Sequence, residues 1–154
     1  EVAGLVRDVR NVTVTGNFIK NREEWFEGID IVHFNERERK FISRETDPRK
    51  ICEDVQSSGP KIVLYTVGEN GSFILGREFI KIPAFKVTEV DPTGAGDVFT
   101  TSFDIRYFET ENEKESGFFA TAAASFKIED FGSKNIQTRQ RVEDRAKTLA
   151  IDAL

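Results

Sequence analysis

A short segment, Asp91-Pro92-Thr93-Gly94-Ala95-Gly96-Asp97, combines small residues with two carboxylates and could bind an anion. It follows an extended stretch and precedes a run of residues with helical spacing. Gly94, Ala95 and Gly96 would let the backbone approach a ligand closely, and their amides would join the unpaired donors at the positive end of a helix dipole. The segment therefore predicts a site for a phosphoryl group.

Asp97 follows these small residues directly and would lie in the first turn of the helix, beside a bound anion. There it could accept the proton of an attacking hydroxyl group during phosphoryl transfer. The helix dipole favours its charged form, and weak basicity is no obstacle because positioning and charge neutralisation dominate this chemistry. The alternative is a plain strand-to-helix turn in which Asp97 only stabilises the dipole.

Three more segments carry short patterns of polar or small residues that ordinary structure can also explain. Asn35 and Glu38 form the pattern N-x-x-E, which a helix cap followed by solvated charges also explains. Residues 66–72 (TVGENGS) form a glycine-rich turn between two apolar runs, which an ordinary hairpin explains equally well. The small residues 120–124 (ATAAA) would allow the close approach of a neighbouring helix or of a flat ligand.

The elements that must position these residues alternate between strands and helices. Short apolar or alternating runs predict strands, and charged runs rich in helix formers predict helices. The predicted strands are 11–15, 28–34, 61–67, 72–75 and 79–82; the predicted helices are 22–27, 36–57 interrupted at Asp47-Pro48, 98–108, 113–127 and one starting near Thr138. This order predicts an α/β fold with a mainly parallel sheet and an antiparallel extension.

Helical spacing supports two of the late helices. In the helix after the small-residue turn, one face contains Val98, Thr101, Ser102, Ile105 and Phe108, and the last helix carries Val142, Ala146, Leu149 and Ala150.

Composition limits the alternatives. The chain has 154 residues, a length typical of one domain, and 38% of them are hydrophobic while 32% are charged. A net charge of −5 disfavours a nucleic-acid partner, and the absence of a long apolar run disfavours the membrane, so we expect a cytoplasmic protein. A single cysteine, Cys52, excludes an internal disulfide, and a lone His33 excludes most histidine-dependent chemistry.

The segment from Asp91 to Phe99 (DPTGAGDVF) resembles the signature D-T-x-G-A-G-D-x-F of the ribokinase or phosphofructokinase-B family of sugar kinases. The N-x-x-E pattern, the T-x-G-x-x-G turn and the alanine-rich run with the later Phe131-Gly132-Ser133 loop occur in the family's order. The resemblance implies a ribokinase-like three-layer sandwich with a mainly parallel central sheet. It also implies ATP-dependent phosphorylation of a sugar or polyol hydroxyl group.

The resemblance assigns roles to the residues that match the family's motifs. Asp97 corresponds to the general base, and Gly94, Ala95 and Gly96 correspond to the anion hole. Glu38 would act on Mg²⁺ through the phosphates or water, and Asp91 matches a position that in some relatives helps to hold a monovalent cation such as K⁺. The nucleotide-binding positions implied are Asn35, Glu38, Thr66, Gly68, Gly71, Thr121 and Gly132.

Members of this family are about twice as long as this chain. We therefore expect residues 1–154 to be the C-terminal, nucleotide-binding and catalytic part of a single ribokinase-like domain, without the acceptor-binding half and lid. Alone, this part is expected to be inactive and to self-associate through an open sheet edge, for example as a homodimer. Residues 1–7 (EVAGLVR) resemble a segment of the inositol kinase branch.

Two other functions stay open on the sequence alone. A nucleoside or vitamin-precursor kinase of the same fold would differ from a sugar kinase only in the acceptor-binding half. A non-catalytic nucleotide-binding module would keep the small-residue turn and lack the acceptor site.

Overall fold

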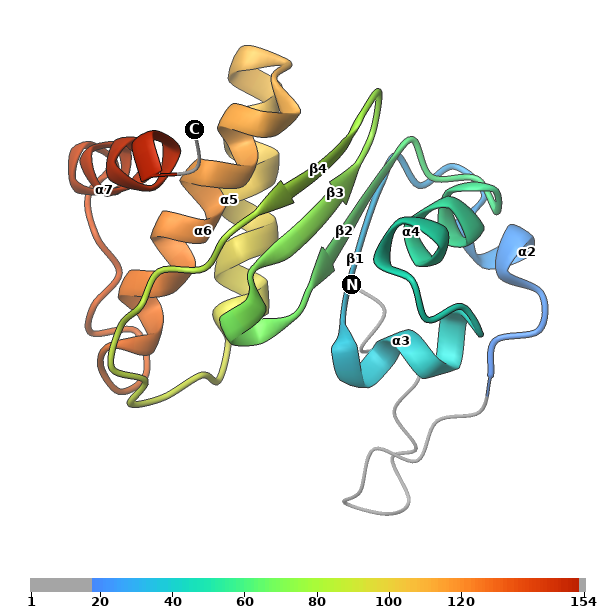
Figure 1. The fold of residues 1–154 in the computed structure, drawn as a ribbon, viewed down its shortest axis with the longest axis horizontal. Coiled ribbons are helices and arrows are strands. Elements are labelled where there is room, and N and C mark those ends of the chain that lie inside the picture. Colours follow the sequence, from blue (N-terminus) through green and yellow to red (C-terminus); the bar gives the residue numbers. More distant parts are fainter. Residues whose placement is uncertain (1–17, 153–154) are drawn as a thin grey trace. The chain divides into compact units, whose positions relative to one another are not determined.

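The computed structural model describes residues 18–152, and Figure 1 shows their fold. The described chain divides into two compact units. Unit 1 contains the residues up to Val67 together with Phe73–Phe79, and unit 2 contains Gly68–Ser72 and the residues from Ile80 onward. The strand predicted at 11–15 and the inositol kinase-like segment at 1–7 lie outside the described residues.

Unit 1 alternates helices and strands as the sequence predicts. In chain order these are α2 (Arg22–Phe26), β1 (Ile31–Asn35), α3 (Glu36–Ile42), α4 (Pro48–Gln56) and β2 (Ile62–Thr66). The predicted break between the two longer helices is confirmed, because Pro48 takes the first position of α4 and Asp47 accepts a hydrogen bond from the Lys50 amide at 3.0 Å. α3 packs on β1 and α4 packs on β2.

Strands β1 and β2 are parallel, with Ile31 opposite Ile62 and Asn35 opposite Thr66. β3 (Ser72–Leu75) and β4 (Phe79–Ile82) follow, and the sheet order is β1-β2-β3-β4. Only residues 67–71 join β2 to β3 and only residues 76–78 join β3 to β4. Connections this short cannot cross over between parallel strands, so the predicted antiparallel extension is confirmed.

The core of unit 1 is formed by buried apolar side chains. Phe34, Ile42, Val55 and Val63 are fully buried, and so is Cys52. Burial raises the pKa of the Cys52 thiol to about 12, as expected of a cysteine that serves as a small core residue. Stacked aromatic rings, one from each strand, add to this core: Phe34, Tyr65, Phe73 and Phe79, with successive centroids 5.0, 5.9 and 5.6 Å apart.

Unit 2 is built mainly from three helices, α5 (Ala95–Thr110), α6 (Glu113–Ile128) and α7 (Arg139–Asp152). α5 and α6 lie side by side in Figure 1 and pack extensively, and α7 packs on α6. Arg106 of α5 joins all three, since its guanidinium contacts Glu115 at 2.6 Å and Glu143 at 3.4 Å. Asn112 caps α6 by accepting a hydrogen bond from the Glu115 amide at 3.0 Å.

The helix predicted at 98–108 is confirmed as α5, and the face that helical spacing groups together is not its buried face. The buried residues of this helix are Phe99 and Phe103, whereas Ile105 is 48% exposed and Phe108 is 82% exposed. Apolar residues occur on several sides of α5, so spacing alone does not identify the buried side, and packing against α6 decides it. Of the residues named above on the last helix, Val142, Ala146 and Leu149 are buried in α7.

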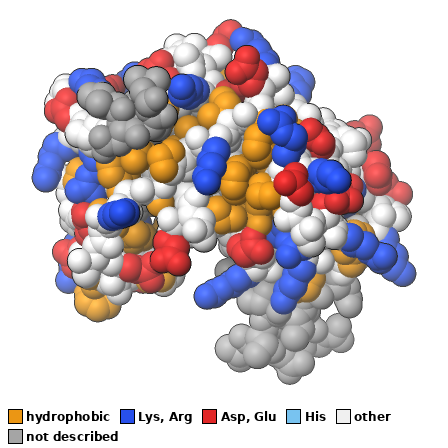
Figure 2. All heavy atoms as spheres, in the orientation of Figure 1, with side chains coloured by type: hydrophobic (Ala, Val, Ile, Leu, Met, Phe, Trp, Pro, Cys, Tyr) orange, Lys and Arg blue, Asp and Glu red, His pale blue; other side chains and the backbone are white. Residues whose placement is uncertain are grey.

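Charged side chains of both signs are interspersed over the face shown in Figure 2, as expected from a chain in which 32% of the residues are charged. None of the helices among residues 18–152 combines the length and the apolar character needed to cross a membrane.

Candidate functional site

The carboxyl ends of β1 and β2 bring two of the predicted nucleotide-binding residues together. Asn35 and Thr66 are register partners in this parallel pair, so they lie at the same edge of the sheet. His33, which is buried, lies within hydrogen-bond distance of Thr66, with 3.0 Å between Nε2 and Oγ1. Ligands of open α/β sheets bind beyond the carboxyl ends of the strands, and both residues are at such an end.

Asn35 and Glu38 form a capping box at the start of α3. The Asn35 side-chain oxygen accepts hydrogen bonds from the amides of Arg37 at 2.9 Å and Glu38 at 3.1 Å. In return, Glu38 Oε2 accepts a hydrogen bond from the Asn35 amide at 3.0 Å. The helix-cap interpretation of N-x-x-E is therefore confirmed, and it fixes the positions of both side chains at the strand end.

The turn between β2 and β3 depends on glycine at two motif positions. Gly68 has φ +57° and Gly71 has φ +90°, in the left-handed region that glycine adopts readily. A Cβ atom at Gly68 would meet no other atom within 4 Å, whereas one at Gly71 would lie 2.1 Å from the Ile82 carbonyl oxygen. Gly71 is therefore required by the fold of unit 2, and Gly68 is required only by its backbone angle.

The small-residue turn begins α5 as predicted. Gly94 is the residue before the helix, has φ +80° and supplies no side-chain cap. The Ala95 amide donates to the Pro92 carbonyl at 3.1 Å, and the Val98 amide donates to the Gly94 carbonyl at 3.1 Å. The Gly96 amide lies in the first turn, where helix geometry provides no carbonyl one turn earlier.

Asp97 lies in the first turn of α5 and is exposed. A Cβ atom at Gly94 would lie 3.7 Å from Asp97 Oδ2, so this carboxylate is beside the turn. The arrangement places the amides of a helix N-terminus and a carboxylate within one helical turn, and phosphoryl transfer to a hydroxyl group needs such a combination.

Asp91 is held by a network that the sequence does not reveal. Its Oδ1 accepts a hydrogen bond from the Thr93 amide at 3.0 Å, and its Oδ2 accepts one from the Gly132 amide at 2.9 Å. The Lys127 ammonium donates to the Asp91 carbonyl at 2.8 Å and lies 3.4 Å from Oδ2. These hydrogen bonds, led by that of the Gly132 amide, hold the pKa of Asp91 well below its usual range.

Lys127 is the residue of this region that sequence reasoning missed. It is only 4% exposed, and its Cε would lie 3.9 Å from a Cβ atom at Gly94. Its partner Asp91 is 36 positions earlier in the chain, beyond the reach of local patterns. One signal was present: a single basic residue inside the run 120–128 (ATAAASFKI), which is otherwise apolar or small. Burying a lone charge is costly, so such a lysine indicates a specific partner.

Two further predicted nucleotide-binding residues, Thr121 and Gly132, have different surroundings. Gly132, with φ +60°, is joined to Asp91 as described above. Thr121 lies inside α6 and is 8% exposed; its hydroxyl oxygen has no hydrogen-bond partner among the described residues. A buried hydroxyl without a partner is uncommon, so Thr121 retains capacity for a ligand hydrogen bond.

The oxygen donors of the predicted metal-binding residues suit Mg²⁺ better than they suit K⁺. Within the described part of the chain, no group of three or more histidine, cysteine, aspartate or glutamate side chains could hold a metal ion. Glu38 offers one carboxylate, which suits Mg²⁺ held mainly by phosphates and water. At Asp91 the carbonyl oxygen and Oδ2 already contact the Lys127 ammonium, and Oδ1 accepts the Thr93 amide, so these oxygens do not fit an additional monovalent cation.

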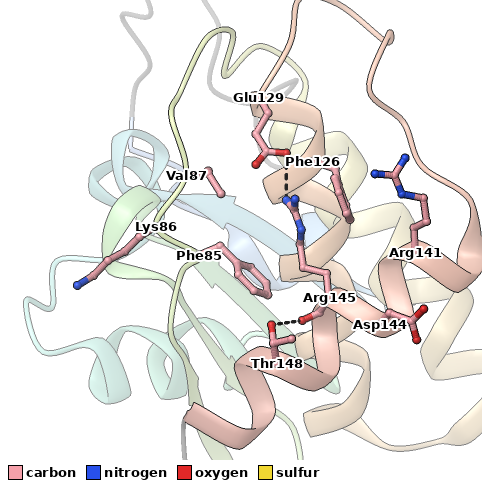
Figure 3. Close-up of a pocket in the computed structure, with 9 residues that line it drawn as sticks. All are labelled: Phe85, Lys86, Val87, Phe126, Glu129, Arg141, Asp144, Arg145 and Thr148. Carbon is pink, nitrogen blue, oxygen red and sulfur yellow. Dashed lines mark hydrogen bonds and ion pairs between the residues drawn. The ribbon is translucent and has the colours of Figure 1, made fainter.

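A hollow in unit 2, drawn in Figure 3, contains none of the predicted site residues. It lies between α6, α7 and the extended segment at 85–87. Its central Arg145 stacks on Phe126, with 3.3 Å between the guanidinium carbon and the ring centroid, and bonds Glu129 at 3.1 Å and Ser125 at 2.9 Å. These contacts fasten α7 to α6, so Arg145 has a structural role.

Comparison with known proteins agrees with the motifs. The model of the pfkB family carbohydrate kinases matches residues 3–139, which is most of the chain. The chain belongs to this family. Among curated relatives of this pfkB chain, the nucleoside kinase of Methanothermobacter thermautotrophicus is 41% identical over 80 residues, covering 52% of this chain and 26% of the relative.

Solved structures identify the fold as the ribokinase fold. The ribokinase of Thermotoga maritima matches with a TM-score of 0.72 and 32% identity, covering 81% of this chain and 44% of that protein. The Arabidopsis thaliana ribokinase complexed with ribose and ATP matches with a TM-score of 0.71 and 30% identity, covering 81% and 43%. The pfkB chain therefore spans less than half the length of these relatives.

Proposed function

We propose that this chain is the C-terminal, nucleotide-binding and catalytic part of an ATP-dependent kinase that phosphorylates a hydroxyl group of a sugar or polyol. The observation that carries the proposal is the start of α5, where a glycine turn without a side-chain cap stands next to the Asp97 carboxylate. The structure of the Arabidopsis ribokinase, which contains ribose and ATP, supports a sugar as the acceptor and ATP as the phosphoryl donor.

In this proposal the Gly94–Asp97 turn binds the phosphoryl group that is transferred, through backbone amides at the helix N-terminus. Asp97 accepts the proton of the acceptor hydroxyl group. The acceptor oxygen forms a bond to the terminal phosphorus, and the bond between that phosphorus and the oxygen of the departing ADP breaks. Asp97 then returns the proton to solvent.

The remaining predicted residues position the nucleotide in this proposal. Asn35 and Thr66, at adjacent strand ends, face the phosphates with Gly68 and Gly71 of the following turn. Glu38 would hold Mg²⁺ through phosphate oxygens or water, and the ion would supply positive charge to the phosphates. Within unit 2, the base would lie near the Thr121 hydroxyl and the Gly132 loop, whose contacts are described above.

A nucleoside is the second candidate acceptor. It is favoured by the 41% identity to the Methanothermobacter nucleoside kinase, which exceeds the identity to either ribokinase structure. The chemistry at Asp97 would be the same for both acceptors, because each presents a hydroxyl group.

The test is ADP release by the full-length protein against a panel of sugars, polyols including inositol, and nucleosides. A parallel preparation of Asp97→Asn corrects for contaminating kinases. We expect one acceptor class to be phosphorylated by the wild type and not by the variant. Nucleotide binding with no turnover on any acceptor would instead indicate a non-catalytic module, and residues 1–154 alone are expected to show no turnover.

A further inference from the structure

A positively charged side chain, the Lys127 ammonium, lies beside the small-residue turn. The Lys127 ammonium lies 2.8 Å from the Asp91 carbonyl oxygen and 3.4 Å from Asp91 Oδ2. These are two oxygen atoms of one residue, a carbonyl and a carboxylate, and hard monovalent cations use donors of the same kind. The ammonium thus takes the position at which the sequence suggested a metal ion.

The same ammonium is close to the predicted phosphoryl site. Lys127 Cε lies within van der Waals reach of a Cβ at Gly94, and so does Asp97 Oδ2. Lys127 is 4% exposed, and the charge of a buried lysine is screened little by solvent. Asp91, Lys127 and the glycine turn of α5 therefore form one compact group within unit 2.

Asp91 also ties this group to the loop after α6. Its Oδ2 accepts the Gly132 amide at 2.9 Å while it faces the lysine. The charged Asp91 carboxylate would repel a phosphate bound at the α5 turn unless a cation lay between or beside them. The ammonium meets this requirement and at the same time holds Asp91 in the orientation that binds the loop.

We propose that Lys127 is a built-in cation that positions Asp91 and the Gly132 loop beside the α5 turn, so that this enzyme needs no monovalent metal ion. The proposal rests on the proposed kinase function for its activity readout. Lys127 is a positioning residue in it, because it acts through Asp91 and the turn.

The experiment compares KCl with tetramethylammonium chloride at equal ionic strength in the full-length protein. We expect wild-type turnover to differ by less than about two-fold between the salts, because the Lys127 ammonium already occupies the cation position. Lys127→Ala removes the ammonium and leaves room for an ion, so its turnover should fall at least about ten-fold in tetramethylammonium and recover in KCl. Lys127→Met, which fills the same space without charge, should lose turnover without that recovery.

A second readout does not depend on kinase activity. The unfolding temperature of the wild type should be equal in the two salts, and that of Lys127→Ala should be lower and should rise with K⁺, because an ion that binds only the folded state stabilises it. Lys114→Ala is the matched control, since Lys114 is an exposed lysine of the same helix. It should behave as the wild type in both measurements.

Several results would overturn the proposal. One is a wild type that K⁺ activates or stabilises strongly; another is a Lys127→Ala variant that matches the wild type in tetramethylammonium. If no variant phosphorylates any acceptor, the proposed function fails, and the unfolding temperatures alone decide the role of Lys127.

Discussion

Two helices of this chain, α3 in unit 1 and α5 in unit 2, follow extended segments and differ in what satisfies their first amides. At α3 the Asn35 side-chain oxygen accepts hydrogen bonds from two of these amides, those of Arg37 and Glu38. At α5 the residue before the helix is Gly94, which has no side chain to do so. A helix capped by a side chain has fewer amides left to bind an anion. At α5 the Ala95 amide donates to the Pro92 carbonyl, and no side chain of Gly94 covers the amides that follow it.

The difference also separates how the two motifs would act on a nucleotide. Asn35 and Glu38 are fixed by the capping box, so they would act through side-chain atoms that the cap does not use. The Gly94–Asp97 turn would act through the backbone, with one carboxylate added. Similar short polar motifs at helix starts can therefore serve a ligand in different ways.

Gly94→Asp would break this comparison most strongly. A carboxylate fixed at the turn would repel a phosphate about 4 Å away by several kcal/mol, so we expect the ATP dissociation constant to rise at least about 100-fold. The neutral, equally large Gly94→Asn should raise it far less, because both side chains tolerate the left-handed backbone. Isothermal titration measures both constants, and equal losses would contradict an anion site at this turn.

Gly71→Ala should have the largest effect on stability. Its Cβ would fall 2.1 Å from a backbone oxygen of β4, so strands must shift, and we expect a loss of at least about 2 kcal/mol. Gly68→Ala meets no atom and should lose about 1 kcal/mol through its backbone angle alone. Urea unfolding of both variants gives the free energies of unfolding.

If Gly71→Ala and Gly68→Ala destabilise equally, the turn has a different structure from the one described. A Gly68→Ala variant that keeps its stability but binds ATP more weakly would support a nucleotide contact at Gly68.

Asn35→Ala tests the other side of the comparison, the helix that caps itself. Removing the side-chain acceptor leaves the amides of Arg37 and Glu38 unsatisfied, so the free energy of unfolding should fall by about 1 kcal/mol. Asn35→Ser retains an acceptor and should recover most of that loss, as measured by urea unfolding. An Ala variant as stable as the wild type would contradict the capping box.

The smallest expected effect is the loss of stability at acid pH that comes from the Arg22–Asp54 ion pair of unit 1. Hydrogen bonds from Arg22, aided by one from Ser43, lower the pKa of Asp54. The carboxylate therefore stabilises the fold fully above about pH 4, its ordinary pKa, and loses this contribution as pH falls through the lower folded value. Because the pair is partly exposed, the effect should be modest.

The measurement is the pH dependence of the free energy of unfolding between neutral pH and pH 3. Asp54→Asn should show a smaller fall than the wild type, and Glu53→Gln, an exposed neighbour on α4, should show the same fall as the wild type. Identical curves for all three proteins would remove the ion pair from the account.

Much of the fold could be predicted because its signals are local. Proline at the start of α4 and the short apolar runs at β1 and β2 each depend on a few adjacent residues. The buried side of α5 could not be predicted, since Phe99 and Phe103 are buried while equally apolar Phe108 is exposed. That choice depends on packing between helices, which spacing within one helix does not encode.

The candidate site likewise contains features that local motifs predict and features that depend on contacts between distant segments. The left-handed backbone at Gly68, Gly71 and Gly94 follows from motifs that glycine alone satisfies easily. The contact between Lys127 and Asp91 joins two segments 36 positions apart and appears only when the chain is folded. The roles of the site residues in catalysis stay predictions until they are measured.

The most direct test of the central claim is Asp97→Asn in the full-length protein, with turnover and the ATP dissociation constant measured on the same preparation. We expect turnover to fall at least about 1000-fold while the dissociation constant changes less than about three-fold, since the carboxylate acts on the acceptor proton. Glu111→Gln, an exposed site just beyond the other end of α5, is the control and should match the wild type. Turnover retained by Asp97→Asn would contradict the account.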